Sequence, residues 1–228
     1  MTINSRTQSI LETAIRDYIR TGKPVSSEQL CCDHDFGVRP ATIRSELNCL
    51  IDGGFLMQPH TSAGRVPTDK GYRFLVDNIL ENIADDIILT RSRLRNLFAE
   101  EASKLVQDLA AELNLLGVGY EANDGDLHKE GLGGLFAKLD LADKKDIFEI
   151  ISDFEMIDDR IDNIMNHISG QKPNVFIGKS PITKSRHLSV VADIYNRNGE
   201  QLVLLAIGPK RMNYPKVIQT FTILHQYE

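Results

Sequence analysis

One stretch of the chain, residues 40–74, constrains the fold more than any other. Its first part predicts a helix, because Pro40 is well placed at a first helical position. A Gly-Gly pair ends that helix, and a strand is predicted over residues 55–57, ahead of the polar run 60–65. A helix followed by a ribbon with a polar tip is the layout of a winged helix-turn-helix. In that fold the helix enters the major groove of DNA, and the ribbon lies along the backbone or in the adjacent minor groove.

Two further helices are predicted before this stretch. Apolar residues recur on one face of residues 9–21, and Gly22 can supply a left-handed cap at the C-terminal end. The next helix is predicted to begin at Ser26, because Gln29 lies three residues further on and completes a capping box. The sequence therefore predicts three helices before the ribbon.

The third helix is predicted to have two different faces. Its buried stripe comprises Ile43, Leu47, Leu50 and Ile51. A rotation of about 100° per residue places short, polar or basic side chains on and beside the opposite face, namely Ala41, Thr42, Arg44, Ser45, Asn48 and Cys49. A face of this kind suits a helix that reads bases in a groove.

The ribbon tip is predicted to contact the DNA backbone. Small residues there let backbone N–H groups approach phosphates closely, and an arginine adds charge. The DNA-binding residues predicted from the helix and the tip together are Arg39, Ala41, Thr42, Arg44, Ser45, Asn48, His60, Thr61, Ser62 and Arg65. The alternative is that the three helices and the ribbon form a protein-interaction module, because a fold does not fix a function.

The run from Pro40 to Phe74 strongly resembles the DNA-binding domain of the HrcA family of heat-inducible transcription repressors. In that family a helix of the Ala-Thr-Ile-Arg type precedes a wing reading Gln-Pro-His-Thr-Ser-Ala-Gly-Arg-Val-Pro-Thr-Asp-x-Gly-Tyr-Arg, which this chain matches without a gap from Gln58 to Arg73. The resemblance implies a repressor of chaperone genes in the heat-shock stress response. It also implies an inverted-repeat operator of double-stranded DNA as the target and the GroE chaperonin as the effector. Where the family usually has a serine cap this chain has Arg39, which loses about 1 kcal/mol of capping but adds a cation that can reach a phosphate.

The net charge of −6 is divided unevenly along the chain. Residues 1–74 hold nine Lys/Arg and eight Asp/Glu, a net of +1, which leaves 17 basic and 24 acidic residues, a net of −7, for residues 75–228. Because the contact surface sets the local field, the acidic average does not exclude DNA binding. It does argue against tight binding that is independent of sequence. No apolar run approaches the roughly 20 residues of a membrane helix and no signal peptide is seen, so a cytoplasmic location without membrane contact is expected.

The rest of the chain predicts a mixed region of helices and strands. A helix is expected from about residue 69 and a longer one over residues 87–114, whereas the Gly- and Asp-rich residues 116–126 are predicted to form a loop. The remaining predicted elements are a helix over 143–167 with a break near Asp153, strands over 175–177, 188–195 and 202–207 with a hairpin turn at 197–200, and a closing helix over 215–227.

This region resembles the carboxyl half of the HrcA effector-type domain, which has a GAF-like α+β fold. The resemblance rests on residues 131–135, on 175–178 and on the block 207–214, for which we expect a packing role rather than a binding one. Family members are longer, and the shortfall falls around residues 117–131. The resemblance therefore implies an α+β protein. It further implies a winged helix-turn-helix over residues 1–82, followed over residues 87–228 by a helical connector and a truncated GAF-like domain without the family's inserted dimerisation domain.

An inverted repeat requires two recognition helices about 34 Å apart, or a multiple of that, so a homodimer is expected. Without the insert another surface must supply the contact. The candidate is the apolar stripe of the predicted helix 87–114, formed by Leu94, Leu97, Phe98, Leu105 and Leu109. The alternative is that this stripe packs against the α+β region of the same chain.

No enzymatic chemistry, metal or cofactor is expected. The six histidines are scattered, and Cys31, Cys32 and Cys49 lack zinc-site spacing. The Gly-rich residues 131–134 are not followed by the Lys-Ser/Thr of a phosphate loop, and the acidic residues 158–162 read as a solvated helix face. Two alternatives to a chaperonin-responsive repressor remain, a regulator that senses a small molecule and a paralogue that does not repress.

Overall fold

A computed structural model describes residues 3–60, 63–82, 101–139, 143–197 and 199–227. The chain divides into two compact units, residues 1–81 (unit 1) and residues 82–228 (unit 2). Each unit is described by itself. None of the described helices is long and apolar enough to cross a membrane.

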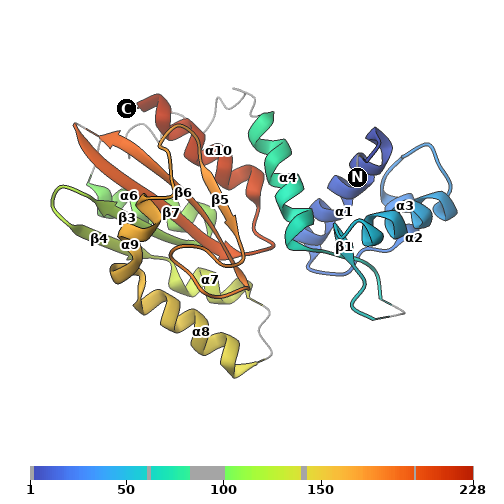
Figure 1. The fold of residues 1–228 in the computed structure, drawn as a ribbon, viewed down its shortest axis with the longest axis horizontal. Helices are drawn as coiled ribbons and strands as arrows, with labels where there is room; N and C mark the ends of the chain where they lie inside the picture. Colours follow the sequence, from blue (N-terminus) through green and yellow to red (C-terminus); the bar gives the residue numbers. More distant parts are fainter. Residues whose placement is uncertain (1–2, 61–62, 83–100, 140–142, 198, 228) are drawn as a thin grey trace. The chain divides into compact units, whose positions relative to one another are not determined.

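Unit 1 consists of four helices and a short ribbon (Figure 1). The elements are α1 (Ser5–Thr21), α2 (Ser27–Asp33), α3 (Pro40–Asp52), β1 (Leu56–Met57), β2 (Val66–Pro67) and α4 (Asp69–Glu81). The two strands pair antiparallel, with Leu56 opposite Pro67 and Met57 opposite Val66. The three helices and the ribbon predicted from the sequence are thus present in the predicted order.

The helix ends of unit 1 follow the capping residues. The helix α1 begins four residues earlier than predicted, because the Asn4 side chain caps it by accepting a hydrogen bond from the Thr7 backbone N–H at 2.9 Å. The predicted caps Gly22, with φ of 67°, and Ser26, which accepts from the Gln29 N–H at 3.1 Å, are confirmed. At the start of α3, Arg39 makes no side-chain capping bond, as expected for a non-capping residue.

Unit 2 contains a five-stranded antiparallel sheet in the order β4-β3-β7-β6-β5. The strands are β3 (Leu116–Glu121), β4 (Asp126–Glu130), β5 (Asn174–Ile177), β6 (Leu188–Arg197) and β7 (Glu200–Pro209). The helices are α6 (Ala102–Leu113), α7 (Leu132–Lys138), α8 (Lys144–Glu155), α9 (Ile157–Met165) and α10 (Tyr214–Leu224), followed by a 3₁₀ turn, His225–Tyr227.

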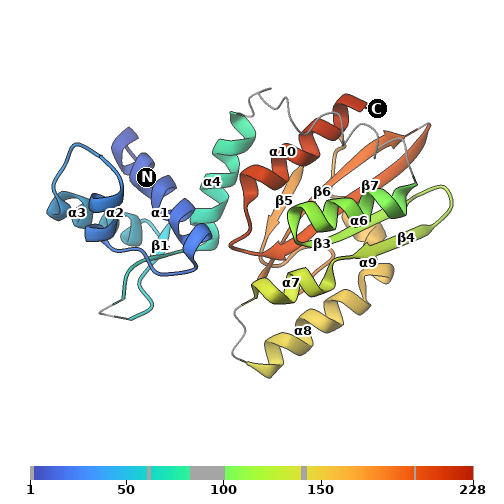
Figure 2. The ribbon, with the colours of Figure 1, turned by 180° about the vertical axis from the view of Figure 1, so that it is seen from behind.

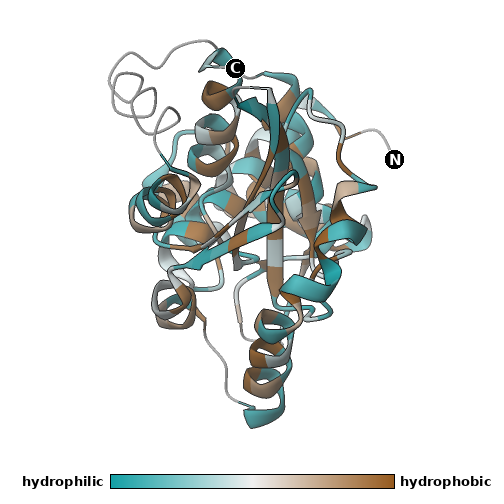
Figure 3. Ribbon diagram, turned by 90° about the vertical axis from the view of Figure 1, so that its left-hand side faces the viewer, coloured by the Kyte–Doolittle hydropathy of each residue, from teal (hydrophilic) through white to brown (hydrophobic). Residues whose placement is uncertain are grey.

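Helices cover both faces of this sheet (Figures 1 and 2). On one face, α7, α8 and α9 pack against a hydrophobic cluster that includes Ile150, Ile161, Val190, Val203 and Leu205. On the other face lie α6 and α10. The covering helices carry hydrophobic and hydrophilic residues on different sides (Figure 3), as helices between a core and solvent do. The result is a three-layer α+β arrangement around an antiparallel sheet.

The prediction of a loop over residues 116–126 is right only for residues 122–125, which form a turn, and is wrong for the rest. Residues 116–121 form β3 and residue 126 begins β4, and β3 pairs with β7 in the middle of the sheet. The glycines that indicated a loop are needed for close packing, because a Cβ on Gly119 would lie 2.4 Å from Cγ2 of Val106 in α6. The sheet therefore gains two strands that the sequence reading did not anticipate.

The long helix predicted over residues 87–114 falls partly outside the described residues, and its described part is α6. Leu105 and Leu109 are buried within unit 2, 0% and 5% exposed, so the prediction that they form a dimer surface is wrong. The other three members of the proposed stripe, Leu94, Leu97 and Phe98, lie outside the described residues. The predicted helix break near Asp153 lies instead at Met156, between α8 and α9.

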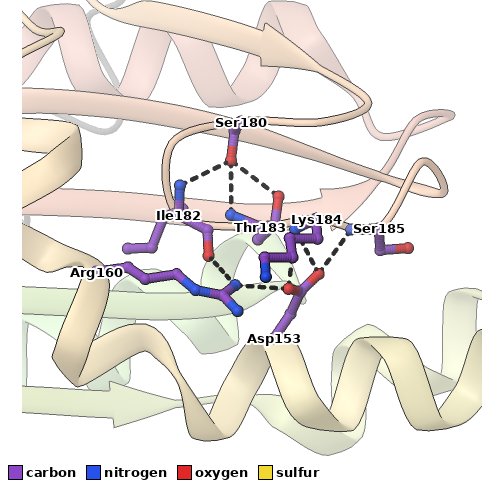
Figure 4. Close-up of polar contacts among 7 residues, drawn as sticks. All are labelled: Asp153, Arg160, Ser180, Ile182, Thr183, Lys184 and Ser185. Atoms are coloured by element: carbon purple, nitrogen blue, oxygen red, sulfur yellow. Dashed lines mark hydrogen bonds and ion pairs between the residues drawn. The ribbon is translucent and has the colours of Figure 1, made fainter.

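The buried carboxylate of Asp153 is the centre of a network of polar contacts (Figure 4). Its side chain is 3% exposed and pairs with Nη1 of Arg160 at 2.7 Å. It also accepts hydrogen bonds from the backbone N–H groups of Lys184 and Ser185 at 2.8 Å, and Arg160 donates to the Ile182 carbonyl at 3.0 Å. The carboxylate thus ties α8 and α9 to the connection between β5 and β6.

The block 207–214 is used for packing, as expected. A Cβ on Gly208 would lie 2.6 Å from Cδ2 of Leu115, so β7 and Leu115 are in close contact. The Tyr214 hydroxyl donates to the Lys210 carbonyl at 2.8 Å and lies 2.9 Å from the Ser189 hydroxyl, and Arg211 donates to the Lys138 carbonyl at 2.8 Å. Burial, followed by the charges of Lys216 and Arg211, lowers the pKa of Lys138 below its ordinary value.

Candidate nucleic-acid interface

The two faces of α3 differ sharply in exposure. Ile43, Leu47 and Leu50 are completely buried, and Ile51 is half-buried. The predicted groove-facing residues Ala41, Arg44, Ser45, Asn48 and Cys49 are exposed, as is Arg39, whereas Thr42 is half-buried. The helix therefore presents a row of short, polar and basic side chains to solvent while its apolar stripe holds it in the core.

A partly buried anchor fixes α3 against α1. The carboxylate of Glu46 accepts a hydrogen bond from the Thr7 hydroxyl at 2.6 Å and pairs with Arg6 at 2.9 Å. The hydrogen bond from Thr7 is the main cause that lowers the pKa of Glu46. Burial opposes it as the second-largest effect, and the hydrogen bond and charge of Arg6 lower the pKa further. Sequence reasoning missed this anchor, since Arg6 and Glu46 are 40 positions apart and no local pattern links them.

The C-terminal end of α3 is held by the segment that follows the ribbon. The Thr68 hydroxyl donates to the Gly54 carbonyl at 2.7 Å, and Lys70 Nζ donates to the Gly53 carbonyl at 2.7 Å. A Cβ on Gly71 would lie 2.3 Å from the carbonyl oxygen of Phe55. The stretch that resembles the family wing therefore contains residues that hold the helix in place as well as residues that could touch DNA.

The ribbon is attached to the rest of unit 1 at Arg65. Its N–H donates to the Val25 carbonyl at 2.8 Å, and its carbonyl accepts from the Val25 N–H at 2.9 Å. A Cβ on the preceding Gly64 would lie 2.7 Å from backbone atoms of Pro24 and Val25. Gly64 and Arg65 thus belong to the base of the ribbon and not to its tip, which corrects the sequence-based placement. Of the other predicted tip residues, His60 is exposed, and Thr61 and Ser62 lie outside the described residues.

Two exposed side chains of α3 are in contact with neighbouring elements. Arg44 Nη2 lies 3.4 Å from Oε1 of Glu28 in α2. Arg65 Nη2 donates to Oδ1 of Asn48 at 3.1 Å. The structure therefore brings Asn48 and Arg65 together, two residues predicted separately as DNA contacts.

The cysteines and histidines do not assemble around α3. Cys31 is half-buried with Sγ 3.9 Å from the Val38 carbonyl, and Cys32 and Cys49 are exposed free thiols. His34 pairs with Asp17 at 2.8 Å and links α2 to α1. Among the described residues, no group of three or more His, Cys, Asp or Glu side chains is placed to hold a metal ion.

Comparison with known proteins identifies the family. Residues 73–218, more than half of the chain, match the family model described as the HrcA protein C-terminal domain. The chain belongs to the HrcA family. It is 44% identical over 116 residues to the heat-inducible transcription repressor HrcA of Natranaerobius thermophilus, a match that covers 50% of this chain and 34% of that protein. It is 55% identical over 75 residues to the repressor of the same name from Bifidobacterium longum, covering 33% of this chain and 20% of the relative.

These HrcA relatives are named as transcription repressors, and the family is not one of enzymes. The chain matches about a third or less of the length of these relatives. A crystal structure of a hypothetical protein superposes with a TM-score of 0.74 at 17% identity and covers 99% of this chain and 97% of the other. That likeness concerns the fold alone.

Proposed function

We propose that this HrcA family member is a sequence-specific DNA-binding repressor of heat-shock genes, and that unit 1 is its winged helix-turn-helix. The observation that carries the proposal is the exposed polar face of α3, on which Arg44, Ser45 and Asn48 are free of core packing. A helix of this kind fits the major groove, where side chains can read base edges. The named relatives, heat-inducible transcription repressors, support the same assignment.

Each part of the surface is proposed to have its own task. On α3, Ala41, Thr42, Arg44, Ser45 and Asn48 contact bases or the nearest phosphates. Arg39, at the exposed start of the helix, reaches a phosphate, and its position at a helix N-terminus favours an anion there. His60, Thr61 and Ser62 lie along the DNA backbone beside the helix.

The operator is proposed to be an inverted repeat upstream of chaperone genes, bound by a homodimer. Two-fold symmetric DNA requires two copies of α3, and one chain supplies one. The region 87–228 is proposed to act as a connector and a GAF-like effector domain that responds to the GroE chaperonin, beside a DNA-binding domain over residues 1–82.

A footprint of the purified chain on genomic DNA tests this proposal. We expect protection of an inverted repeat whose half-site centres are separated by one helical turn, about 10 bp, or a multiple of it. Sedimentation at micromolar concentration supplies the assembly state, for which a dimer is expected. Protection without sequence preference contradicts the proposed repressor, and a strict monomer that binds the full repeat without cooperativity contradicts the proposed dimer.

A further inference from the structure

Arg65 is held in place by contacts of both its backbone and its side chain. Both its backbone hydrogen-bonding groups are engaged by Val25, a buried residue, and Gly64 before it presses against the same backbone. Its Nε atom is enclosed by protein and has no hydrogen-bond partner among the described residues, so the stem of the side chain does not lie free in solvent. A side chain held in this way suits a contact within the protein better than a contact with a DNA phosphate, which requires the side chain to extend into solvent.

The fixed contact is the one to Asn48. A guanidinium has only donors, so the atom of the Asn48 amide that faces Nη2 at 3.1 Å must be the oxygen, Oδ1. The other end of the same amide is an NH₂ group. It makes no hydrogen bond within the described part of the chain, and Asn48 is exposed on the face of α3 proposed to enter the groove. Arg65 therefore decides which end of the amide is left for DNA.

We propose that Arg65 is a positioning residue that orients the Asn48 amide so that its NH₂ donors face the bases. The inference rests on the proposed function, because it assumes that α3 enters the major groove. A donor group pairs with a base that presents an acceptor, which is guanine through O6 and N7, thymine through O4 or adenine through N7. Cytosine presents only its N4 amino donor there. On the DNA strand that Asn48 contacts, a purine or thymine is thus accepted and cytosine is disfavoured, although Asn48 taken alone could turn either end of its amide to a base.

This assignment differs from a direct phosphate contact in what it predicts. A phosphate contact weakens binding to all sequences equally when it is removed and lowers the salt slope by roughly one unit. A positioning role leaves the salt slope nearly unchanged and removes discrimination at one base position. The loss depends on Asn48, so it disappears when Asn48 has already been replaced.

The experiment is selection from a library of random DNA duplexes by the full chain, followed by affinity measurements on duplexes with each base at each selected position. The wild type is compared with Asn48→Ala, Arg65→Gln, the double variant and Arg65→Lys. We expect Asn48→Ala to lose the preference at one position and so to identify it. At that position the wild type should disfavour cytosine by about tenfold, in the range of one good base contact. Arg65→Gln should reduce this to about twofold or less, because a glutamine amide can face Asn48 with either a donor or an acceptor.

Arg65→Lys is the matched control, since it keeps a charge and a donor-only group and should retain most of the discrimination. Asn48→Asp leaves Arg65 and the core untouched, and its carboxylate should turn the preference towards cytosine. Thermal unfolding checks that each variant is folded. Uniform weakening by Arg65→Gln with a lower salt slope and intact rejection of cytosine overturns the inference, as does an Asn48→Ala variant that keeps every base preference. If the wild type enriches no sequence, the proposed function itself fails.

Discussion

An ion pair on the candidate face of unit 1 and an ion pair between the helices α8 and α9 of unit 2 have different surroundings. On α3, the Arg44 side chain is 58% exposed and its partner Glu28 is 76% exposed. In unit 2, the Asp153 side chain is 3% exposed and its partner Arg160 is 13% exposed. Exposed pairs contribute little to stability and exchange partners readily, whereas a buried pair is costly to break. The exposed side chains on α3 therefore remain available to a ligand, whereas the buried pair of Asp153 and Arg160 serves to hold the fold together.

The largest expected effect comes from breaking the buried network. Asp153→Ala would leave Arg160 without its ion-pair partner and the N–H groups of Lys184 and Ser185 without their acceptor. We expect a loss of about 3–5 kcal/mol in the free energy of unfolding, measured by urea denaturation. The matched control is Asp158→Ala on α9, whose 61% exposed side chain pairs with Lys129, and for which a change within about 0.5 kcal/mol is expected. Similar losses for the two variants would remove the contrast between buried and exposed pairs.

A smaller effect is expected from adding a methyl group at Gly71, in the segment that holds the C-terminal end of α3. Gly71→Ala places a methyl group 2.3 Å from the Phe55 carbonyl oxygen, so the backbone must shift, at a cost of about 1–3 kcal/mol. Gly133→Ala in α7 is the control, because no atom beyond its chain neighbours and its own helix backbone lies within 4 Å of the added Cβ, and alanine favours a helix. Thermal unfolding of both variants measures the difference. A Gly71→Ala protein as stable as the wild type would show that this glycine is not required by the fold.

Tyr214→Phe tests whether the block 207–214 belongs to the core of unit 2. The variant removes a buried hydroxyl that bonds the Lys210 carbonyl and lies beside the Ser189 hydroxyl, and should cost about 1–2 kcal/mol. Chemical denaturation gives the value. Full stability in this variant would argue that the hydroxyl is kept for something other than packing.

The smallest effect concerns the pH dependence of the α1–α3 anchor. Because the pKa of Glu46 is lowered from its ordinary value of 4.5, folding stabilises the ionised carboxylate. The contribution is therefore complete above that ordinary value and is lost as the pH falls through the lower pKa of the folded state. Unfolding of the wild type and Glu46→Gln measured at pH 7 and at successively lower pH should show a difference that shrinks on acidification. A difference that does not change with pH would contradict the role assigned to the charge.

Local signals in the sequence predict the order of elements in unit 1, although α1 begins four residues earlier than predicted. The caps at Gly22 and Ser26 and the proline at position 40 act within a few residues and lie where they are predicted, and the apolar stripe of α3 is buried except for the half-buried Ile51. The contacts that place the candidate surface are of another kind. The pairs formed by Arg65 with Val25 and with Asn48 join residues 40 and 17 positions apart, and no local pattern indicates them.

Unit 2 shows where local reasoning fails. The glycines at positions 117 and 119 predict a loop, because glycine is common in turns, yet they lie in β3, where α6 approaches too closely for larger side chains. The packing partner of α6 is likewise not evident from its sequence. An apolar stripe does not reveal whether it faces another copy or its own sheet, and Leu105 and Leu109 face their own unit.

The central claim is that the exposed face of α3 reads DNA, and the affinity of Arg44→Ala for an operator duplex tests it most directly. The operator found by footprinting is compared with a scrambled duplex of the same composition, at one salt concentration, by fluorescence anisotropy. Arg186→Ala, which removes an exposed arginine of unit 2, is the control. The account predicts that folded Arg44→Ala loses about 1–3 kcal/mol of binding to the operator and much less to the scrambled duplex, while Arg186→Ala binds as the wild type does. Unchanged operator affinity in folded Arg44→Ala would contradict the account.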